Sequence, residues 1–143
     1  MRRAGRVVIS AGPTREPIDP VRFISNYSTG TMGVCLAREA LRRHYRVTLI
    51  TGPVDVAPPR GARVVPVEQA DQMRRALRQQ MRAADVLIMA AAVCDFQPAT
   101  RRRAKLPRRA RLTLALKATP DIVGSLPRRK GQLIVGFALE SGN

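Results

Sequence analysis

The sequence is poor in aromatic residues and histidine, and each shortage excludes a class of function. Aromatic residues make up 3% of the 143 positions and tryptophan is absent, so the core must be aliphatic. The few scattered rings offer no platform for stacking single-stranded nucleic acid, and a nucleic-acid partner is therefore not expected. His44 is the only histidine. We expect it on the surface or near a helix end, which leaves little support for a Ser–His or Cys–His mechanism.

Cysteine and long apolar runs are also scarce. Cys35 and Cys94 are too far apart to form a CxxC pair, so we expect neither a disulfide framework nor a metal site made by the protein. Both are predicted to be buried thiols in a reducing compartment. No apolar run approaches the ~18 residues of a membrane span, and the short run after the basic N-terminus is interpreted as a first strand rather than a signal peptide. We expect a cytoplasmic protein without a membrane partner.

Positive charge, in contrast, is abundant. The formal net charge is +16, which favours polyanionic partners such as phosphorylated ligands, unless the arginines only cover solvated faces. Nearly all of this charge is arginine, because Lys105, Lys117 and Lys130 are the only lysines. Lys105 lies in the densest arginine run, RRRAKLPRRAR at 101–111. By itself this lysine is most simply explained as part of a solvated charge run.

Hydrophobic periodicity indicates alternating strands and helices. Apolar runs predict strands at 6–10, 46–51, 63–67, 85–93, 111–117 and 131–139, and helical spacing or caps predict helices at 31–43, 68–84 and 119–127. The runs at 85–93 and 131–139 are typical of fully buried parallel strands, whereas Pro66 places its strand towards an edge. This order predicts one α/β domain over 1–143, a three-layer, Rossmann-like, doubly wound and mainly parallel sheet.

The three predicted helices rest on different signals. The first two carry apolar stripes, which are Met32, Leu36 and Ala40 in one and Ala70, Met73, Leu77 and Met81 in the other. The third is predicted from a Thr119 cap with Pro120 in the first turn.

Ligands in such sheets bind beyond the carboxyl ends of the strands, so the loops there are candidate sites. The first loop contains STGTMG, in which Ser28, Gly30 and Gly33 precede a helix. This is either an anion site made of backbone N–H groups or a plain cluster of helix-start glycines. Asp95 follows a buried strand and could hold ribose or base groups, or cap a loop.

Two further loop features narrow the function. The chain lacks the GxGxxG fingerprint, and Thr51 ends the second strand in place of an acidic residue, which disfavours an NAD-dependent oxidoreductase. The segment 97–110 is the longest irregular and most basic stretch, and we expect it to be a mobile flap.

Six stretches, in order, resemble phosphopantothenoylcysteine synthetase, the coenzyme A ligase domain often fused behind a flavin-dependent decarboxylase. They are AGPTREPIDPVRFISNYSTGTMG (11–33), VTLITGPV (47–54), AAAVCDFQP (90–98), KLPR (105–108), TPDIV (119–123) and VGFALES (135–141). The resemblance covers essentially the whole chain, and the first stretch is its most specific part.

The resemblance implies a two-step ligase. The carboxylate of 4′-phosphopantothenate attacks the α-phosphate of a nucleoside triphosphate, which is CTP in bacterial-type members, and pyrophosphate leaves. The amine of L-cysteine then attacks the acyl-cytidylate to give 4′-phosphopantothenoylcysteine and CMP. Mg²⁺ accompanies the triphosphate. A homodimer and a flavin-dependent decarboxylase partner are also implied.

Family roles carry over to matching positions. Asn26 stands at the asparagine that acts on the acyl-cytidylate, where an amide can donate to an oxygen that gains charge. Lys105 stands at the first lysine of the KxKK motif, needed to turn the intermediate over. The positions assigned to nucleotide binding are Met89, Ala90, Ala91, Asp95, Lys105, Pro120, Asp121, Ile122, Val123 and Phe137.

The chain departs from the family in two ways. Pro107 and Arg108 replace the second and third lysines of the motif, which stiffens the flap and changes the geometry of its charge. The chain is also short at its C-terminus relative to the family, and we expect it to be an incomplete domain. The alternative is a shortened, non-catalytic relative that binds a nucleotide or a polyanion.

Overall fold

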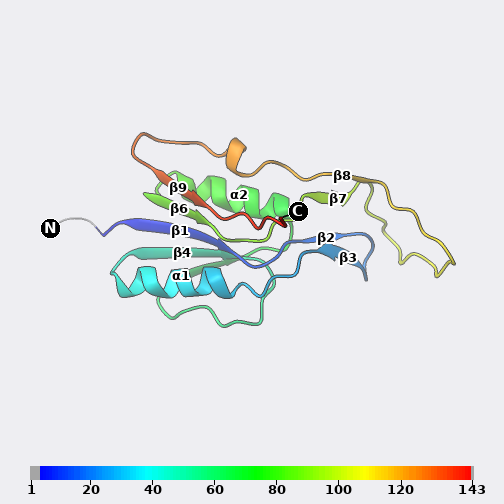
Figure 1. The fold of residues 1–143 in the computed structure, drawn as a ribbon, viewed down its shortest axis with the longest axis horizontal. Helices are drawn as coiled ribbons and strands as arrows, with labels where there is room; N and C mark the ends of the chain where they lie inside the picture. The colour runs from blue at the N-terminus through cyan, green and yellow to red at the C-terminus, as the bar shows by residue number, and fades with distance from the viewer. Residues whose placement is uncertain (1–3, 143) are drawn as a thin grey trace.

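A five-stranded parallel sheet forms the centre of the protein (Figure 1). The computed structural model describes residues 4–142, and within them the strands lie in the order β5–β4–β1–β6–β9. Their bounds are β1 Arg6–Ala11, β4 Arg46–Thr51, β5 Arg63–Pro66, β6 Val86–Met89 and β9 Leu133–Gly136. Each neighbouring pair is parallel. The doubly wound α/β sheet predicted from the sequence is confirmed, with β5 at an edge as expected.

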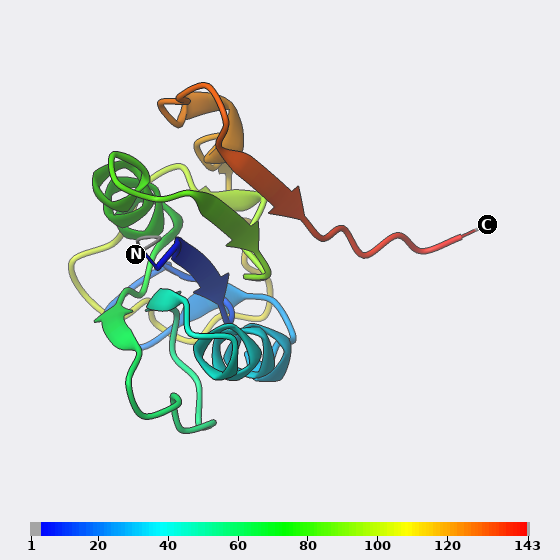
Figure 2. The ribbon, with the colours of Figure 1, turned by 90° about the vertical axis from the view of Figure 1, so that its left-hand side faces the viewer.

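Alternate residues of β1 face opposite layers of the molecule. Val7 and Ile9 pack with helix α1 (Thr31–Arg42), whereas Val8 packs with helix α2 (Ala70–Met81), because successive side chains of a strand point to opposite faces. Figure 2, seen along the strands, shows one helix on each side of the sheet. This is the three-layer arrangement that the alternation of strands and helices predicts.

The two helices differ in how well their sequence stripes predict burial. In α2 the predicted stripe is confirmed, since Ala70, Met73, Leu77 and Met81 are all buried. In α1 the buried residues are Gly33, Val34, Ala37 and Ala40, so the prediction was right for Ala40 but wrong for Met32, which is 54% exposed. A Cβ on Gly33 would lie 2.4 Å from the Ala11 Cβ. Helix α1 therefore contacts the sheet at Gly33, its smallest residue. This orientation places the Met32 side chain on the side of the helix that faces away from the sheet.

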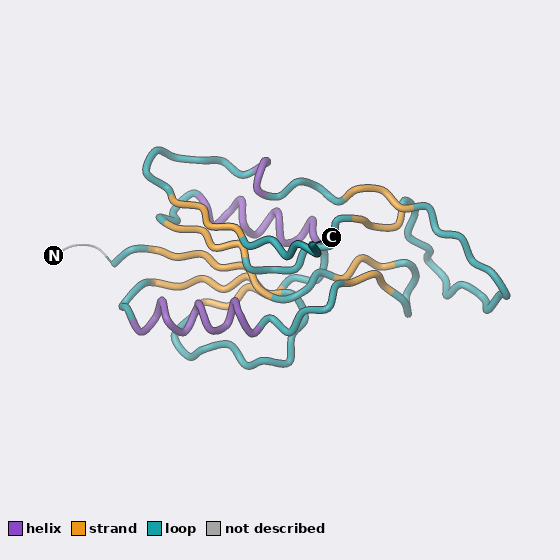
Figure 3. Tube along the Cα trace, viewed as in Figure 1, coloured by secondary structure: helices purple, strands orange, loops and turns teal. Residues whose placement is uncertain are grey.

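Two short hairpins extend beyond the carboxyl edge of the sheet (Figure 3). One pairs β2 (Arg15–Pro17) with β3 (Phe23–Ser25), and the other pairs β7 (Phe96–Pro98) with β8 (Leu116–Ala118), both antiparallel. The first hairpin is tied to α2, because the buried Glu16 carboxylate accepts a hydrogen bond from the Ala70 N–H at 2.8 Å. A carboxylate is favoured at this positive end of a helix.

The strand predictions at the far side of the sheet need correction. β6 ends at Met89 rather than at residue 93, because the chain turns out of the sheet towards the hairpins. β9 is shorter than predicted and is an edge strand of the described sheet, with Leu133 57% exposed. It pairs only with β6 among the described residues. The stretch predicted as a strand at 111–117 contributes only its end to β8, whose residues are all exposed.

The helix predicted at 119–127 is wrong. Only a 3₁₀ turn, η1 (Val123–Ser125), forms there. The Thr119 hydroxyl does not cap a helix but donates to the Cys94 carbonyl at 2.6 Å. The Thr119 hydroxyl thus joins two distant segments of the chain. It is therefore not available to cap the predicted helix.

The remaining expectations about scarce residues were mostly right. Cys94 is buried as predicted, whereas Cys35 is exposed, so that prediction was wrong for Cys35. His44 is exposed and follows the C-terminus of α1 with a φ of 62°, where its N–H donates to the Leu41 carbonyl. Among residues 4–142, no helix is both long enough and apolar enough to cross a membrane.

Candidate functional site

The candidate site lies where the sheet changes its winding direction. The chain leaves β1 towards α1 and β4 on one side, and it leaves β6 towards β9 on the other. The two departing loops touch, because Pro13 and Ala92 form an isolated parallel bridge and the Thr14 N–H donates to the Ala92 carbonyl at 3.3 Å. A crevice beyond the carboxyl ends of such a strand pair is the usual ligand position in doubly wound sheets.

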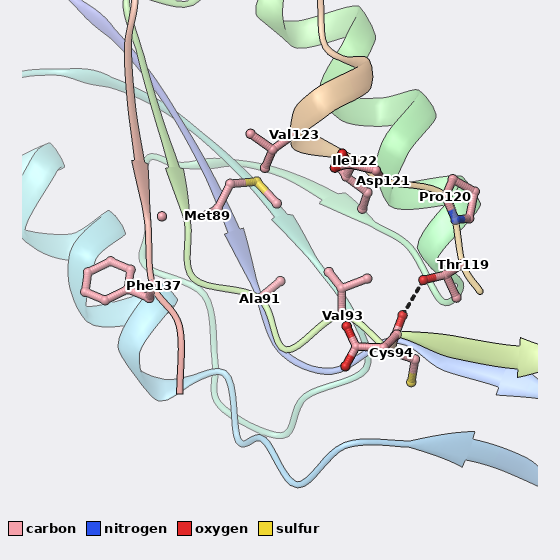
Figure 4. A pocket seen from close by; sticks show the side chains of 12 residues that line it. Met89, Ala91, Val93, Cys94, Thr119, Pro120, Asp121, Ile122, Val123 and Phe137 are labelled. Carbon is pink, nitrogen blue, oxygen red and sulfur yellow. Dashed lines mark hydrogen bonds between the residues drawn. The ribbon is translucent and has the colours of Figure 1, made fainter. Parts of the chain in front are cut away.

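A cleft of about 470 Å³ opens next to this position, beyond the carboxyl ends of β6 and β9 (Figure 4). Its lining residues come from β6 and the turn after it, from the segment before η1 and from the end of β9; they are Met89, Ala91, Val93, Cys94, Asp95, Thr119, Pro120, Asp121, Ile122, Val123, Gly136 and Phe137. The cleft therefore contains every predicted nucleotide-pocket position except Ala90 and Lys105. Segments up to 48 residues apart in the chain (Met89 and Phe137) meet here, and the Phe137 N–H donates to the Met89 carbonyl at 3.2 Å.

Thr119 holds one wall of the cleft to its floor. The Thr119 N–H donates to the Asp95 carbonyl at 2.9 Å, and its hydroxyl donates to the Cys94 carbonyl at 2.6 Å. Figure 4 shows this bond, with Ile122 and Val123 on the wall above and Phe137 on the opposite side. One wall is thus hydrogen-bonded to the turn after β6 and the other to the end of β6 itself, and these contacts between distant segments set the width of the cleft.

The cleft contains two carboxylates and one thiol. Asp95 and Asp121 are both exposed, and Asp121 Oδ1 accepts the Gly124 N–H at 2.9 Å. Cys94 is 2% exposed, and its thiol donates to the carbonyls of Thr14 and Ile24. Burial raises the pKa of the Cys94 thiol. A thiol in this state is a poor nucleophile, so the chemistry of the cleft depends on its carboxylates and main-chain groups.

A second hollow, of about 560 Å³, lies at the N-terminus of α1. Ser28, Gly30 and Ala90 line it, so Ala90 lies next to the predicted anion loop rather than in the cleft. Gly30 has a φ of 75°, and a Cβ there would lie 2.6 Å from the Val54 side chain. Gly33 does not line this hollow but packs on β1. Close packing explains both glycines, and the anion role of Ser28, Gly30 and Gly33 stays a prediction.

Asn26 lies between the first hairpin and the loop after β6. Its Nδ2 donates to the carbonyls of Ala92 at 3.3 Å and Val93 at 3.1 Å. Asn26 also lines a third hollow, of about 690 Å³, next to Ser28. The amide is thus held at the same strand ends as the cleft, and one of its two main-chain bonds must exchange before it can donate to a substrate.

Lys105 lies outside the cleft, on the long connection between β7 and β8. This connection extends farther from the sheet than any other part of the ribbon in Figure 1. Lys105 is exposed and lines none of the three hollows described above. The structure therefore brings Asn26 to the site but leaves Lys105 on the arm beside it.

The flap that carries Lys105 is attached to the turn between β2 and β3. The Asp19 side chain is fully buried there, and its Oδ2 accepts the Leu106 N–H at 3.0 Å. The Arg22 guanidinium bonds Asp19 at 2.7 Å and the Leu106 carbonyl at 3.1 Å. Burial raises the pKa of the Asp19 carboxyl, but hydrogen bonds from three backbone N–H groups and from the Arg22 guanidinium outweigh it and hold the pKa well below its ordinary value.

We expect this attachment to stabilise the protein less in acid. Because the pKa of Asp19 is lowered by folding, its contribution is present in full above the ordinary value of 3.8 and is lost as the pH falls below it. Urea unfolding of the unmodified protein and of Asp19→Asn should give midpoints whose difference is constant above about pH 5 and shrinks below about pH 4. The other carboxylates titrate in the same way in both proteins, so their effects on stability cancel in the difference between the two midpoints. A difference that grows towards pH 3 would contradict the assignment.

Sequence reasoning missed several residues of this site. Val93, Cys94, Thr119 and Gly136 line the cleft although only their neighbours were named. All four lie within the loop stretches that carry the family resemblance, and this position could have indicated that they line the site. Asp19 was also missed, because nothing in the sequence near it indicates a partner 87 residues away.

The sheet and its cleft define a doubly wound α/β domain, a class whose ligands bind at the carboxyl edge of a parallel sheet. Residues 3–143 match the family described as DNA/pantothenate metabolism flavoprotein C-terminal domain. The chain belongs to this family.

Individual relatives agree with this assignment. The chain is 48% identical over 138 residues to the coenzyme A biosynthesis bifunctional protein CoaBC of Bacillus subtilis (strain 168), covering 94% of the chain and 34% of that protein. It is 46% identical over 140 residues to a cysteine/cysteine sulfinic acid decarboxylase of an unknown prokaryotic organism, covering 95% and 39%. The chain thus spans about a third of the length of these curated relatives.

A solved structure shows the same fold. The crystal structure of the C-terminal domain of a coenzyme A biosynthesis bifunctional protein CoaBC matches with a TM-score of 0.84 and 39% identity. The match covers 97% of this chain and 66% of that one.

Proposed function

We propose that this chain contributes the ligase activity that joins 4′-phosphopantothenate to L-cysteine in coenzyme A biosynthesis, through an acyl-cytidylate made from CTP. The observation that carries the proposal is the convergence of the matched nucleotide positions. All of those predicted for the base and ribose except Ala90 line one cleft beyond the carboxyl ends of β6 and β9. Family membership and the names of the CoaBC relatives support a role in coenzyme A biosynthesis.

The cleft suits a flat base. Ala91 is small, and Met89 and Ile122 present apolar surfaces on the floor and the wall. Phe137 is 52% exposed at the far side, where its ring can cover a bound base. Asp95 and main-chain groups of the turn after β6 are the polar groups available to the ribose and the base edge. An apolar cleft with a few polar groups is the usual form of a small-molecule site.

The triphosphate would extend from the cleft towards the N-terminus of α1. Ala90 lies between the two hollows, and Ser28 and Gly30 line the second one. Backbone N–H groups and the positive end of a helix favour phosphate there. The loops after β1 and β6 would thus hold the α-phosphate near Asn26.

Mg²⁺ would be bound mainly by the nucleotide. No group of three or more histidine, cysteine or acidic side chains able to hold a metal occurs within residues 4–142. Mg²⁺ with nucleotides is typically held by one or two carboxylates together with phosphate oxygens. Asp95 and Asp121 line the base cleft, and no acidic residue lines the hollow at α1, so at the phosphates the ion would be held by phosphate oxygens and water. Bound there, the ion would neutralise phosphate charge.

The two reactions exchange bonds at the α-phosphorus and then at the acyl carbon. A carboxylate oxygen of 4′-phosphopantothenate bonds to the α-phosphorus as the bond to pyrophosphate breaks. The cysteine amine then bonds to the acyl carbon, the acyl–phosphate bond breaks with CMP as leaving group, and the amine loses a proton to solvent. The Asn26 amide would donate to the acyl oxygen as it gains charge. The Lys105 ammonium would follow the charge on the phosphoryl oxygens.

The wider context is part of the same proposal. It includes a single ligase unit over 1–143 with a mobile flap at 97–110, a cytoplasmic location, a homodimer and a flavin-dependent decarboxylase partner. Of these, the relatives' names support only the decarboxylase partner, since one relative is called a bifunctional protein and another a decarboxylase. Exposed Phe23, Phe96 and Leu116 on the two hairpins supply apolar surface suited to a second subunit.

Nucleotide binding and the first half-reaction test the proposal. CTP should bind at least tenfold more tightly than ATP, GTP or inorganic triphosphate in titration calorimetry, because the cleft contacts the base. With CTP and 4′-phosphopantothenate but without cysteine, the protein should release pyrophosphate up to one equivalent. Equal binding of CTP and triphosphate that weakens steeply with salt would contradict the ligase and favour the polyanion-binding alternative. Base-selective binding without pyrophosphate release would favour a non-catalytic relative.

A further inference from the structure

The turn between β2 and β3 contains a fully buried carboxylate that binds two segments at once. Asp19 Oδ1 accepts the N–H groups of Val21 and Arg22, each at 2.8 Å, within its own turn. Asp19 Oδ2 accepts the Arg22 guanidinium and the Leu106 N–H. A carboxylate with four donors is well satisfied despite its burial. One of those donors belongs to the flap, so the turn and the flap share this charge.

The flap is hydrogen-bonded to the turn between β2 and β3 through several of its main-chain atoms. Both main-chain groups of Leu106 are used, since its N–H donates to Asp19 and its carbonyl accepts from Arg22. Four residues earlier, the Arg102 N–H donates to the Ile18 carbonyl at 2.9 Å. The short arch between these two attachments contains Lys105, which directly precedes Leu106. The main chain of Lys105 is therefore fixed while its side chain stays exposed.

Charge explains why the attachment uses a carboxylate. The connection between β7 and β8, residues 99–115, which contains the flap, has seven arginines and lysines and no acidic residue, with RRRAKLPRRAR at its centre. Like charges repel one another along such a segment and favour extended, solvated conformations. A buried anion that bonds the backbone of the flap opposes this repulsion without binding the side chain of Lys105.

We propose that Asp19 is a positioning residue for Lys105, acting through the backbone of Leu106. The proposal rests on the proposed ligase function, in which Lys105 acts on the phosphoryl oxygens. Asp19 does not touch the substrate; it sets where the flap places the ammonium group. A purely structural role in the hairpin would stabilise the fold but would not depend on the presence of Lys105.

Proteolysis tests the attachment without relying on activity. Trypsin cleaves after arginine and lysine, so the flap is a dense target once it leaves the hairpin. Asp19→Asn should be cut within 101–111 at least tenfold faster than the unmodified protein. Asp71→Asn is the matched control, because Asp71 also bonds two arginines but lies on α2, and its cleavage rate should not change. Equal flap cleavage in Asp19→Asn and the unmodified protein would overturn the proposal.

A double-variant cycle tests whether the attachment acts through Lys105. Asp19→Asn should lower kcat by about 10- to 100-fold and leave the Kd for CTP unchanged. In a Lys105→Ala background the same change should cost no further activity, because the group being positioned is already absent. An equal loss in both backgrounds would show a structural role and overturn the proposal. If Asp19→Asn does not fold, Leu106→Pro removes the same hydrogen bond from the flap side and should give the same pattern.

Failure of the two proposals can be told apart. An unmodified protein that releases no pyrophosphate would overturn the ligase function and, with it, the catalytic part of this inference. The cleavage rates would still decide whether Asp19 holds the flap to the hairpin.

Discussion

Lys105→Arg is expected to lower the rate of 4′-phosphopantothenoylcysteine formation by about 100-fold or more, the loss typical when one donor to a developing charge is misplaced. The substitution keeps the charge but changes its shape. An ammonium group on a flexible stem can follow charge as it moves over phosphoryl oxygens, whereas a guanidinium presents a rigid planar fork. The flap already contains arginines on both sides of Lys105, so a general need for positive charge would make this lysine replaceable.

Lys130→Arg provides the matched control for this experiment. Lys130 is exposed in the turn before β9, away from the flap, and its replacement should leave the rate within about twofold, as is usual for surface positions without special contacts. Both variants keep the net charge, so the long-range attraction of the triphosphate is the same in each. The measurement is steady-state product formation with saturating CTP. A Lys105→Arg protein as fast as the unmodified one would contradict the role given to Lys105.

Gly52→Ala is expected to lower the free energy of unfolding by about 3 kcal/mol, near the upper end of the usual cost of overpacking. Gly52 follows β4 and is buried, and its N–H donates to the Ala11 carbonyl at 3.0 Å. A Cβ there would lie 1.7 Å from the Pro13 carbonyl oxygen and 2.8 Å from its carbon. Backbone cannot yield as a flexible side chain can, so the loops after β1 and β4 must separate.

The displacement would also reach the site. Pro13 bridges to Ala92 at the switch point, so a shift of Pro13 should weaken CTP binding as well as stability. Gly136→Ala is the control, because nothing lies within 4 Å of a Cβ at that strand position, and its stability should stay within about 0.5 kcal/mol. Urea midpoints of the three proteins provide the comparison. Equal midpoints for Gly52→Ala and Gly136→Ala would show that the two loops are not in close contact.

Local sequence patterns were sufficient where a segment's own residues decide its structure. The apolar stripe of α2, from Ala70 to Met81, predicted the buried face because every third or fourth residue of a helix faces the same way. Pro66 predicted an edge strand because a proline cannot donate a ladder hydrogen bond. The loop stretches around Asn26 and Asp121 likewise predicted a site at the carboxyl edge, since parallel strands place those loops together.

Predictions failed where a distant segment decides the outcome. Thr119 looks like a helix cap, but its hydroxyl bonds the Cys94 carbonyl 25 residues earlier, and no helix follows. The apolar run that contains β9 resembles a buried strand, yet β9 has only β6 as a sheet partner among the described residues, and Leu133 is exposed. Cys35 and Met32 lie on a predicted helix, but the close contact of Gly33 with Ala11 decides which side of α1 meets the sheet.

The sequence by itself determined the order of the central parallel strands and of the two long helices, the residue types at the strand ends and the excess of positive charge on the flap, because these depend on neighbours along the chain. Tertiary structure alone decided the width of the cleft, the place of Lys105 and the burial of Asp19. These depend on hydrogen bonds between residues as far as 87 positions apart. Such bonds form only after the chain has folded, because pairing and desolvation of a charge such as Asp19 require both segments to be in place.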